Sequence, residues 1–162
     1  MWLYLIVGAV VLQRLAELLL SRRNARRLLA SGGREAGRGH YPVMVLLHAS
    51  WLASLLLLVD PATPPRPGWL ALYLLLQLAR VWVVVSLGKR WTTRVIVVPG
   101  AALVERGPYR FMRHPNYVVV AAEVLVLPLV FDAWQIALAF SLANALLLAW
   151  RMRIEDQALG RG

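Results

Sequence analysis

Five apolar runs dominate this chain of 162 residues and limit the folds that it can adopt. A helix of about 20 apolar residues crosses the roughly 30 Å hydrocarbon core of a bilayer, and the first three runs approach that length. The pattern predicts an all-α integral membrane protein with about five transmembrane helices in one domain, residues 1–162. The expected helices cover residues 2–20, 42–59, 69–87, 117–130 and 134–150.

Composition supports a membrane protein. Hydrophobic residues make up 60% of the chain and the mean hydropathy is +0.62, which is too apolar for an ordinary soluble domain. The absence of cysteine excludes disulfides, a thiol nucleophile and cysteine metal ligands, and we expect no metal site. The net charge of +10 lies in blocks between the apolar runs, so we expect a membrane as the partner rather than nucleic acid.

The basic blocks also predict an orientation. Segments 21–41 and 88–116 carry six basic residues each, the tail after residue 150 carries three, and the opposite side carries only Arg66. Because cytoplasmic loops collect Lys and Arg, we expect the N-terminus outside and the C-terminus in the cytoplasm. The last two runs are separated by three residues, which predicts a tight helical hairpin.

Ionisable residues inside the runs need polar partners or a functional role. Arg14 and Glu17 stand at i,i+3 spacing, so we expect them to pair near the cytoplasmic end of the first helix. Arg80 must face a polar cavity or a partner, and Glu123 is one candidate partner. His48 is either a packing residue or a residue that faces a substrate.

Two connecting segments have weaker patterns. Residues 21–41 predict a loop or an interfacial helix that glycines interrupt. Residues 95–98 are strand-like but short, and we predict a loop there. Both Glu123 and Asn144 lie inside the expected hairpin and require polar partners within the bundle.

The segment from Glu105 to Glu123 is polar, basic and marked by proline. Residues 109–117 hold two arginines, a histidine, an asparagine and two tyrosines. Pro115 suits the first position of a helix, and a helix start flanked by arginines attracts anions. Taken alone, the segment is equally compatible with a basic loop that only orients the protein.

Three elements of the C-terminal half, between Gln77 and Leu159, resemble the isoprenylcysteine carboxyl methyltransferase family. The first matches its G-x-Y-R-x-x-R-H-P-x-Y motif through Gly107, Tyr109, Arg110, Arg113, His114, Pro115 and Tyr117. The second resembles the closing R-x-R-x-E-E element through Arg151, Arg153, Glu155 and Asp156, with aspartate in the last place. The third is the end of the third run, with Arg80, Leu87, Gly88, Trp91 and Thr92.

The N-terminal half resembles a bacterial subgroup of that family, associated with type III polyketide synthases and thought to O-methylate alkylpyrones or alkylresorcinols. The resemblance rests on Leu12–Leu15, Glu17, Arg23, Asn24, His40–Pro42 and His48. With the charge pattern, it implies the bacterial cytoplasmic membrane.

The resemblance implies S-adenosylmethionine as the methyl donor and a lipidic acceptor, either an alkylpyrone or alkylresorcinol hydroxyl or a prenylcysteine-like carboxylate. The cofactor pocket is expected from residues 88–117 and 151–159. The implied cofactor-binding residues are Val98, Leu103, Arg113, His114, Pro115, Tyr117 and Glu155. The implied catalytic residues are Arg80, Tyr117 and Arg153, and the implied substrate-binding residues are His48, Arg80 and Glu123.

Other functions stay open at this stage. A phospholipid or other N-methyltransferase shares parts of this architecture, and so does a wider superfamily of reductases, although their chains are usually longer. A non-enzymatic membrane accessory protein would not need the clustered Arg-His-Pro-Tyr and Arg-Glu elements. The oligomeric state is open.

Overall fold

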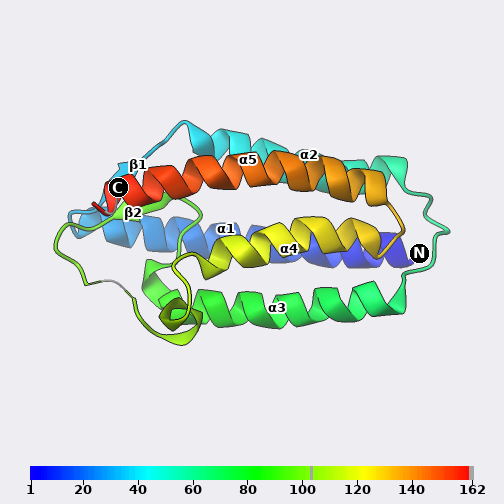
Figure 1. The fold of residues 1–162 in the computed structure, drawn as a ribbon, viewed down its shortest axis with the longest axis horizontal. Helices are drawn as coiled ribbons and strands as arrows, with labels where there is room; N and C mark the ends of the chain where they lie inside the picture. Colours follow the sequence, from blue (N-terminus) through cyan, green and yellow to red (C-terminus); the bar gives the residue numbers. More distant parts are fainter. Residues whose placement is uncertain (103, 161–162) are drawn as a thin grey trace.

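The computed structural model describes residues 1–102 and 104–160, and long helices run side by side along its longest axis (Figure 1). The predicted all-α class is therefore confirmed. The long helices are α1 (Trp2–Ala30), α2 (His40–Leu58), α3 (Pro67–Leu87), α4 (Pro115–Leu129) and α5 (Trp134–Ala158). The short elements are the strands β1 (Arg34–Ala36) and β2 (Val95–Val97) and the 3₁₀ helices η1 (Gly88–Arg90) and η2 (Gly107–Arg110).

Four of these helices, α1, α2, α3 and α5, are long and apolar enough to cross a bilayer, whereas α4 is shorter. The outer surface of the bundle carries large apolar side chains, including Leu46, Leu57 and Leu146, which are 70%, 80% and 68% exposed. Such a surface suits hydrocarbon rather than water. The chain is thus an integral membrane protein.

The helix boundaries follow local chemistry. Pro67 and Pro115 begin α3 and α4, where a missing N–H costs no hydrogen bond, so the predicted role of Pro115 is confirmed. Gly88 follows α3 with a φ of 55°, a conformation that favours glycine. Residues 130–133 join α4 to α5, and the two helices pack against each other.

Two helices extend beyond their predicted ends. The arginine-rich stretch after residue 20 continues α1 to Ala30, because no glycine interrupts residues 21–31. The polar tail after residue 150 continues α5 to Ala158 and ends before Gly160, whose φ is 67°. The motif residues of the tail are therefore held on a helix rather than on a loose segment.

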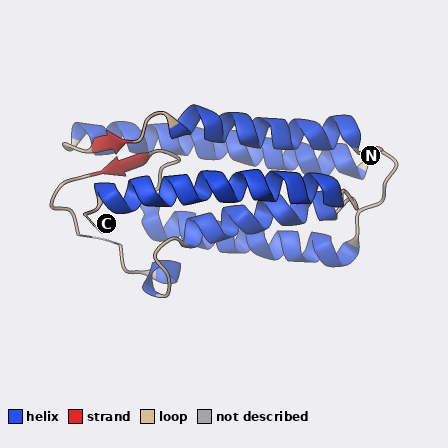
Figure 2. Cartoon of the chain, turned by 45° about the horizontal axis from the view of Figure 1, so that its top comes forward, coloured by secondary structure: helices blue, strands red, loops and turns tan. Residues whose placement is uncertain are grey.

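The prediction of a loop at residues 95–98 was wrong for its first three positions. Val95–Val97 form β2, which pairs antiparallel with β1 in the register Glu35 opposite Ile96. The small sheet lies at the end of the bundle that holds the C-terminal end of α5 (Figure 2). A strand as short as β2 is stable only when it pairs with another segment. Its partner β1 lies some 60 residues earlier in the chain, so the local sequence gives no sign of the pairing.

The apolar core lies toward the opposite end, where α1 begins and α4 ends. Its fully buried members include Leu3, Val7, Leu55, Leu127 and Val130. This end is closed by tight packing, which leaves the other end of the bundle for polar groups.

A buried network of charges links α1, α3 and α4. Arg14 contacts both Glu17 and Glu123 at 2.9 Å, so the predicted Arg14–Glu17 pair is confirmed. Arg80 contacts Glu123 at 2.7 Å and bonds to both oxygens of Glu17. Gln77 donates a further hydrogen bond to Glu123 at 3.0 Å. The two arginines balance the two glutamates, which is what buried charges require.

We expect this network to be necessary for stability. Glu123→Gln would leave two arginines against one carboxylate and should lower the free energy of unfolding by about 3–5 kcal/mol. The matched control is Asp132→Asn, which breaks the exposed pair with Arg66 (2.6 Å) and should cost about 1 kcal/mol or less. Reversible unfolding in detergent micelles measures both. Equal small losses would contradict this role of the network.

Candidate functional site

A polar cavity of about 550 Å³ lies at the end of the bundle that carries the sheet. Its walls come from the segment between η1 and Glu105, from the start of α4 and from the last two turns of α5. These are the parts of the chain that the family resemblance assigned to a cofactor pocket. Its polar lining includes Arg90, Thr92, Arg94, Glu105, Tyr109, Arg110, Arg113, His114, Asn116, Tyr117, Arg151 and Glu155.

The N-terminal half holds this segment in place. Asn24 is buried in α1 and donates hydrogen bonds to the carbonyl oxygens of Gly88 at 3.1 Å and Trp91 at 2.8 Å. Ser21, one turn earlier, bonds to both the side chain and the backbone N–H of Thr93. The turn after α3 is therefore fixed by side chains of α1.

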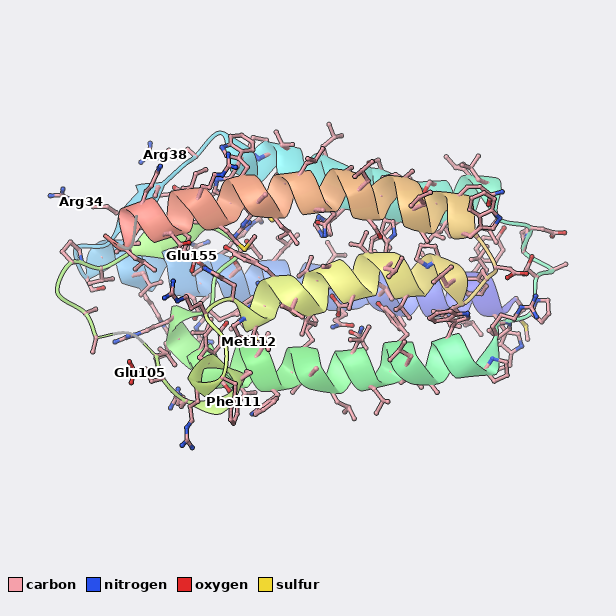
Figure 3. All side chains as sticks on the ribbon, viewed as in Figure 1. Arg34, Arg38, Glu105, Phe111, Met112 and Glu155 are labelled. Carbon is pink, nitrogen blue, oxygen red and sulfur yellow. The ribbon has the colours of Figure 1, made fainter. Side chains whose placement is uncertain are left out.

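His114, Tyr117 and Glu155 converge as the sequence suggested. The Tyr117 hydroxyl donates to the Glu155 carboxylate, and the His114 ring stacks on the Tyr117 ring with centroids 5.3 Å apart. His114 Nδ1 lies 3.7 Å from Glu155, and its Nε2 lies 3.4 Å from Asp156. Glu155 lies between α5 and the loops at this end of the bundle (Figure 3).

Arg151 is the residue that sequence reasoning failed to select. It is buried, its guanidinium lies 5.3 Å from the Tyr117 ring centroid, and it donates to the Thr93 carbonyl oxygen at 2.9 Å. Arg153, which the sequence analysis chose instead, is exposed and lies outside the linings of both cavities described here. Residues two apart on a helix face different directions. The i, i+3, i+7 spacing of Asn144, Leu147 and Arg151 places these residues on one face of the helix. This spacing could have identified Arg151 from the sequence.

The remaining expected cofactor residues differ in position. Val98 and Arg113 line the polar cavity, whereas Pro115 is buried and begins α4 without lining it. Leu103 lies outside the described residues. Asn116, which was not selected, lines the cavity, and its buried Oδ1 has no hydrogen-bond partner within the described part of the chain.

Tyr109 contributes a phenol to the same cavity. Burial raises its pKa above the ordinary value, and the nearby Glu155 carboxylate and Tyr117 raise it further. The phenol therefore stays protonated at cellular pH and offers a hydrogen-bond donor.

A second, apolar cavity of about 440 Å³ extends between α1, α2, α4 and α5. All three expected substrate residues, His48, Arg80 and Glu123, line it. His48 Nδ1 lies 2.9 Å from the Met44 carbonyl oxygen, which leaves Nε2 as the free ring nitrogen. Other lining residues are Val11, Leu15, Leu18, Val45, Trp51, Leu52, Leu56, Val120, Val124, Leu147 and Leu148.

Arg80 both pairs with buried carboxylates and lines a cavity, so its structural and functional interpretations are compatible. Its three guanidinium nitrogens are engaged with Glu17 and Glu123, which is the structural pairing considered from the sequence. It also lines the apolar cavity, so the same group contributes positive charge there.

The two cavities share a wall. Five residues line both of them: Trp91, Thr92, Asn116, Tyr117 and Arg151. A polar ligand in the first cavity and an apolar ligand in the second would therefore both lie against these five residues, among them Tyr117 and Arg151. A transfer reaction between a water-soluble donor and a lipid needs this arrangement.

Comparisons with known proteins identify the family of the chain. The model of the isoprenylcysteine carboxyl methyltransferase (ICMT) family matches residues 69–161, which include the end of α3, the polar cavity and the whole of α5. A protein of Bacillus subtilis (strain 168), named "Uncharacterized protein YpbQ", is 40% identical over 162 residues, covering 96% of this chain and 95% of its own. No solved structure matches the chain significantly. The chain belongs to the isoprenylcysteine carboxyl methyltransferase family, a family of membrane methyltransferases.

Proposed function

We propose that this protein is an S-adenosylmethionine-dependent O-methyltransferase that acts on a lipidic acceptor at the cytoplasmic face of the membrane. The observation that carries the proposal is the wall between a polar and an apolar cavity, which includes Tyr117 and Arg151 from the two family motifs. Each cavity suits one of the two reactants.

The polar cavity fits the methyl donor. Its volume of about 550 Å³ lies within the range of small-molecule sites. Glu155 can bind ribose hydroxyls or an amino group, and Arg113 beside the start of α4 suits a carboxylate. The stacked faces of His114 and Tyr117 suit adenine or a cationic sulfonium. The unpartnered Asn116 Oδ1 offers a further acceptor there.

The apolar cavity fits the acceptor. A long alkyl or prenyl chain is already dissolved in the bilayer, so it can enter sideways between helices without crossing water. We assign His48, Arg80 and Glu123 to substrate binding because all three line this cavity. The acceptor is an alkylpyrone or alkylresorcinol hydroxyl or a prenylcysteine-like carboxylate, each an oxygen on a long apolar chain.

The residues of the shared wall supply placement and charge. Bound S-adenosylmethionine provides an electrophilic methyl group on a sulfonium sulfur. Held by His114, Tyr117 and Glu155, it would supply that methyl carbon to an oxygen nucleophile, and its sulfur would keep the electron pair of the broken carbon–sulfur bond. A carboxylate or an ionised pyrone hydroxyl has no proton to lose, whereas a resorcinol hydroxyl would have to give its proton to a base, and His48 lines the apolar cavity but not the shared wall.

We assign the anion-holding role to Arg151 in place of Arg153. Arg151 is buried at the shared wall with its Nε 3.4 Å from the Tyr117 hydroxyl, whereas Arg153 is exposed. A guanidinium fixed by the Thr93 carbonyl is pre-organised for a developing contact with the acceptor oxygen. Arg80 acts deeper in the apolar cavity, where its charge is shared with Glu17 and Glu123.

Substitutions of Arg151 and Arg153 test this assignment. Arg151→Leu should lower the rate of methyl transfer to lipid about 100-fold, because one pre-organised donor is lost. Arg153→Leu should stay within about twofold of the unmodified protein. Labelled S-adenosylmethionine and defined alkylpyrones, alkylresorcinols and prenylcysteines in proteoliposomes measure the rates. The reverse order of the two variants would contradict the assignment, and Arg151→Lys separates loss of the guanidinium from loss of fold.

We also propose that the polar cavity faces the cytoplasm and that five helices span the membrane. The basic segments 21–41 and 88–116 support this orientation, and they lie at the cavity end of the bundle (Figure 1). The cytoplasm is where a soluble methyl donor is available to the cavity.

Cysteine labelling tests the orientation, because the chain contains no cysteine. Ala62 and Ala101 are exposed. Ala62 lies in the loop between α2 and α3 and Ala101 between β2 and η2, and these loops lie at opposite ends of the bundle (Figure 1). A membrane-impermeant maleimide should label Ala62→Cys in intact bacterial cells and Ala101→Cys only after permeabilisation. Labelling of Ala101→Cys in intact cells would reverse the proposed topology.

A further inference from the structure

Asn144 is a buried amide that the protein itself does not satisfy. It lies in α5 with 1% of its surface exposed, and neither Nδ2 nor Oδ1 has a hydrogen-bond partner among the described residues. The expectation that Glu123 and Asn144 both find polar partners is thus met only for Glu123, which bonds to Arg14, Gln77 and Arg80. An unpaired amide within a membrane bundle is costly, so its retention points to a ligand.

The amide lies in the apolar cavity that we assign to the lipid. Asn144 lines the apolar cavity, and Leu147, Leu148 and Arg151 continue the same face of α5 toward the shared wall. Seven residues of α-helix rise by about 10 Å. The backbone of Asn144 therefore lies about two turns deeper in the bundle than that of Arg151.

Arg14 is a charged neighbour of the same cavity. Its guanidinium bonds to Glu17 and Glu123 and lies beside the buried Tyr73 hydroxyl, so it is held by the protein itself. Arg14 also lines the apolar cavity. Because α4 and α5 run antiparallel and Tyr117 meets Arg151, Glu123 and the Arg14 bonded to it lie close to the depth of Asn144.

We propose that Asn144 forms a hydrogen-bonding site for a second oxygen, carried mid-chain by the acceptor lipid. The identification of the ligand as the methyl acceptor rests on the proposed function. A hydroxyl, keto or ester oxygen accepts from Asn144 Nδ2, and a hydroxyl also donates to Asn144 Oδ1. The ligand class is a lipid with one oxygen at the shared wall and another about 10 Å along its chain.

This site would make the enzyme selective. A pocket built to hydrogen-bond a substrate oxygen discriminates against the analogue that lacks it, because the buried polar groups are then left unpaired. A plain hydrocarbon chain fills the volume of the cavity but leaves the Asn144 amide without partners.

Binding of two matched probes tests the site without any methyl donor. The probes are octadecanoic acid and octadecanoic acid with a mid-chain hydroxyl, titrated calorimetrically into the detergent-solubilised full chain. The unmodified protein should bind the hydroxylated probe about tenfold more tightly. Asn144→Leu should bind both probes equally, and its melting temperature without ligand should not fall, because no hydrogen bond within the protein is lost.

Leu147→Met, a volume-conserving change on the same cavity wall, should keep the preference. Equal binding of the probes to the unmodified protein, or an undiminished preference in Asn144→Leu, overturns the inference. A lower melting temperature for Asn144→Leu also overturns it, because it reveals a partner within the protein. Failure of S-adenosylmethionine to bind to a protein that prefers the hydroxylated probe refutes the proposed function alone.

Discussion

Buried charge that must be paired is the constraint on which the structure depends. Lipid-facing helices gain little from hydrophobic association with one another, because hydrocarbon surrounds them on the outside as well. The network of Arg14, Glu17, Arg80 and Glu123 supplies directional contacts instead, and it fixes α1, α3 and α4 relative to one another. Glu123 lies six residues after Tyr117 on α4. The contacts of Glu123 therefore also fix the position of Tyr117, and with it the shared wall, along the bundle axis.

The candidate site consists of a polar cavity and an apolar cavity that lie next to each other in this bundle. The end of α5 presents Arg151 and Glu155 to Tyr117, and α1 pins the turn after α3 through Asn24. One side of Tyr117 is polar and opens to the loops, and the other side is apolar and lies among the helices. Under the proposed function, a small protein would thus bring a water-soluble donor to a lipid without extracting the lipid from the membrane.

Periodic and local features could be predicted from the sequence, whereas features that depend on distant partners could not. The apolar runs located the five helices, Pro115 located the start of α4, and the family resemblance implied that His114 and Glu155, from two separate motifs, lie together. The strand β2 was missed because its partner β1 is remote. Arg151 was missed because two arginines of one motif differ only in the helix face that they occupy.

Calorimetric titration of the purified protein with S-adenosylmethionine tests the central claim most directly. The account predicts saturable binding that weakens at least tenfold in Glu155→Gln, where a charge-assisted contact in the polar cavity is lost. Gln157→Ala, an exposed change one half-turn further along α5, should leave binding unchanged. Absence of binding to the unmodified protein, or equal binding to all three proteins, would contradict the account.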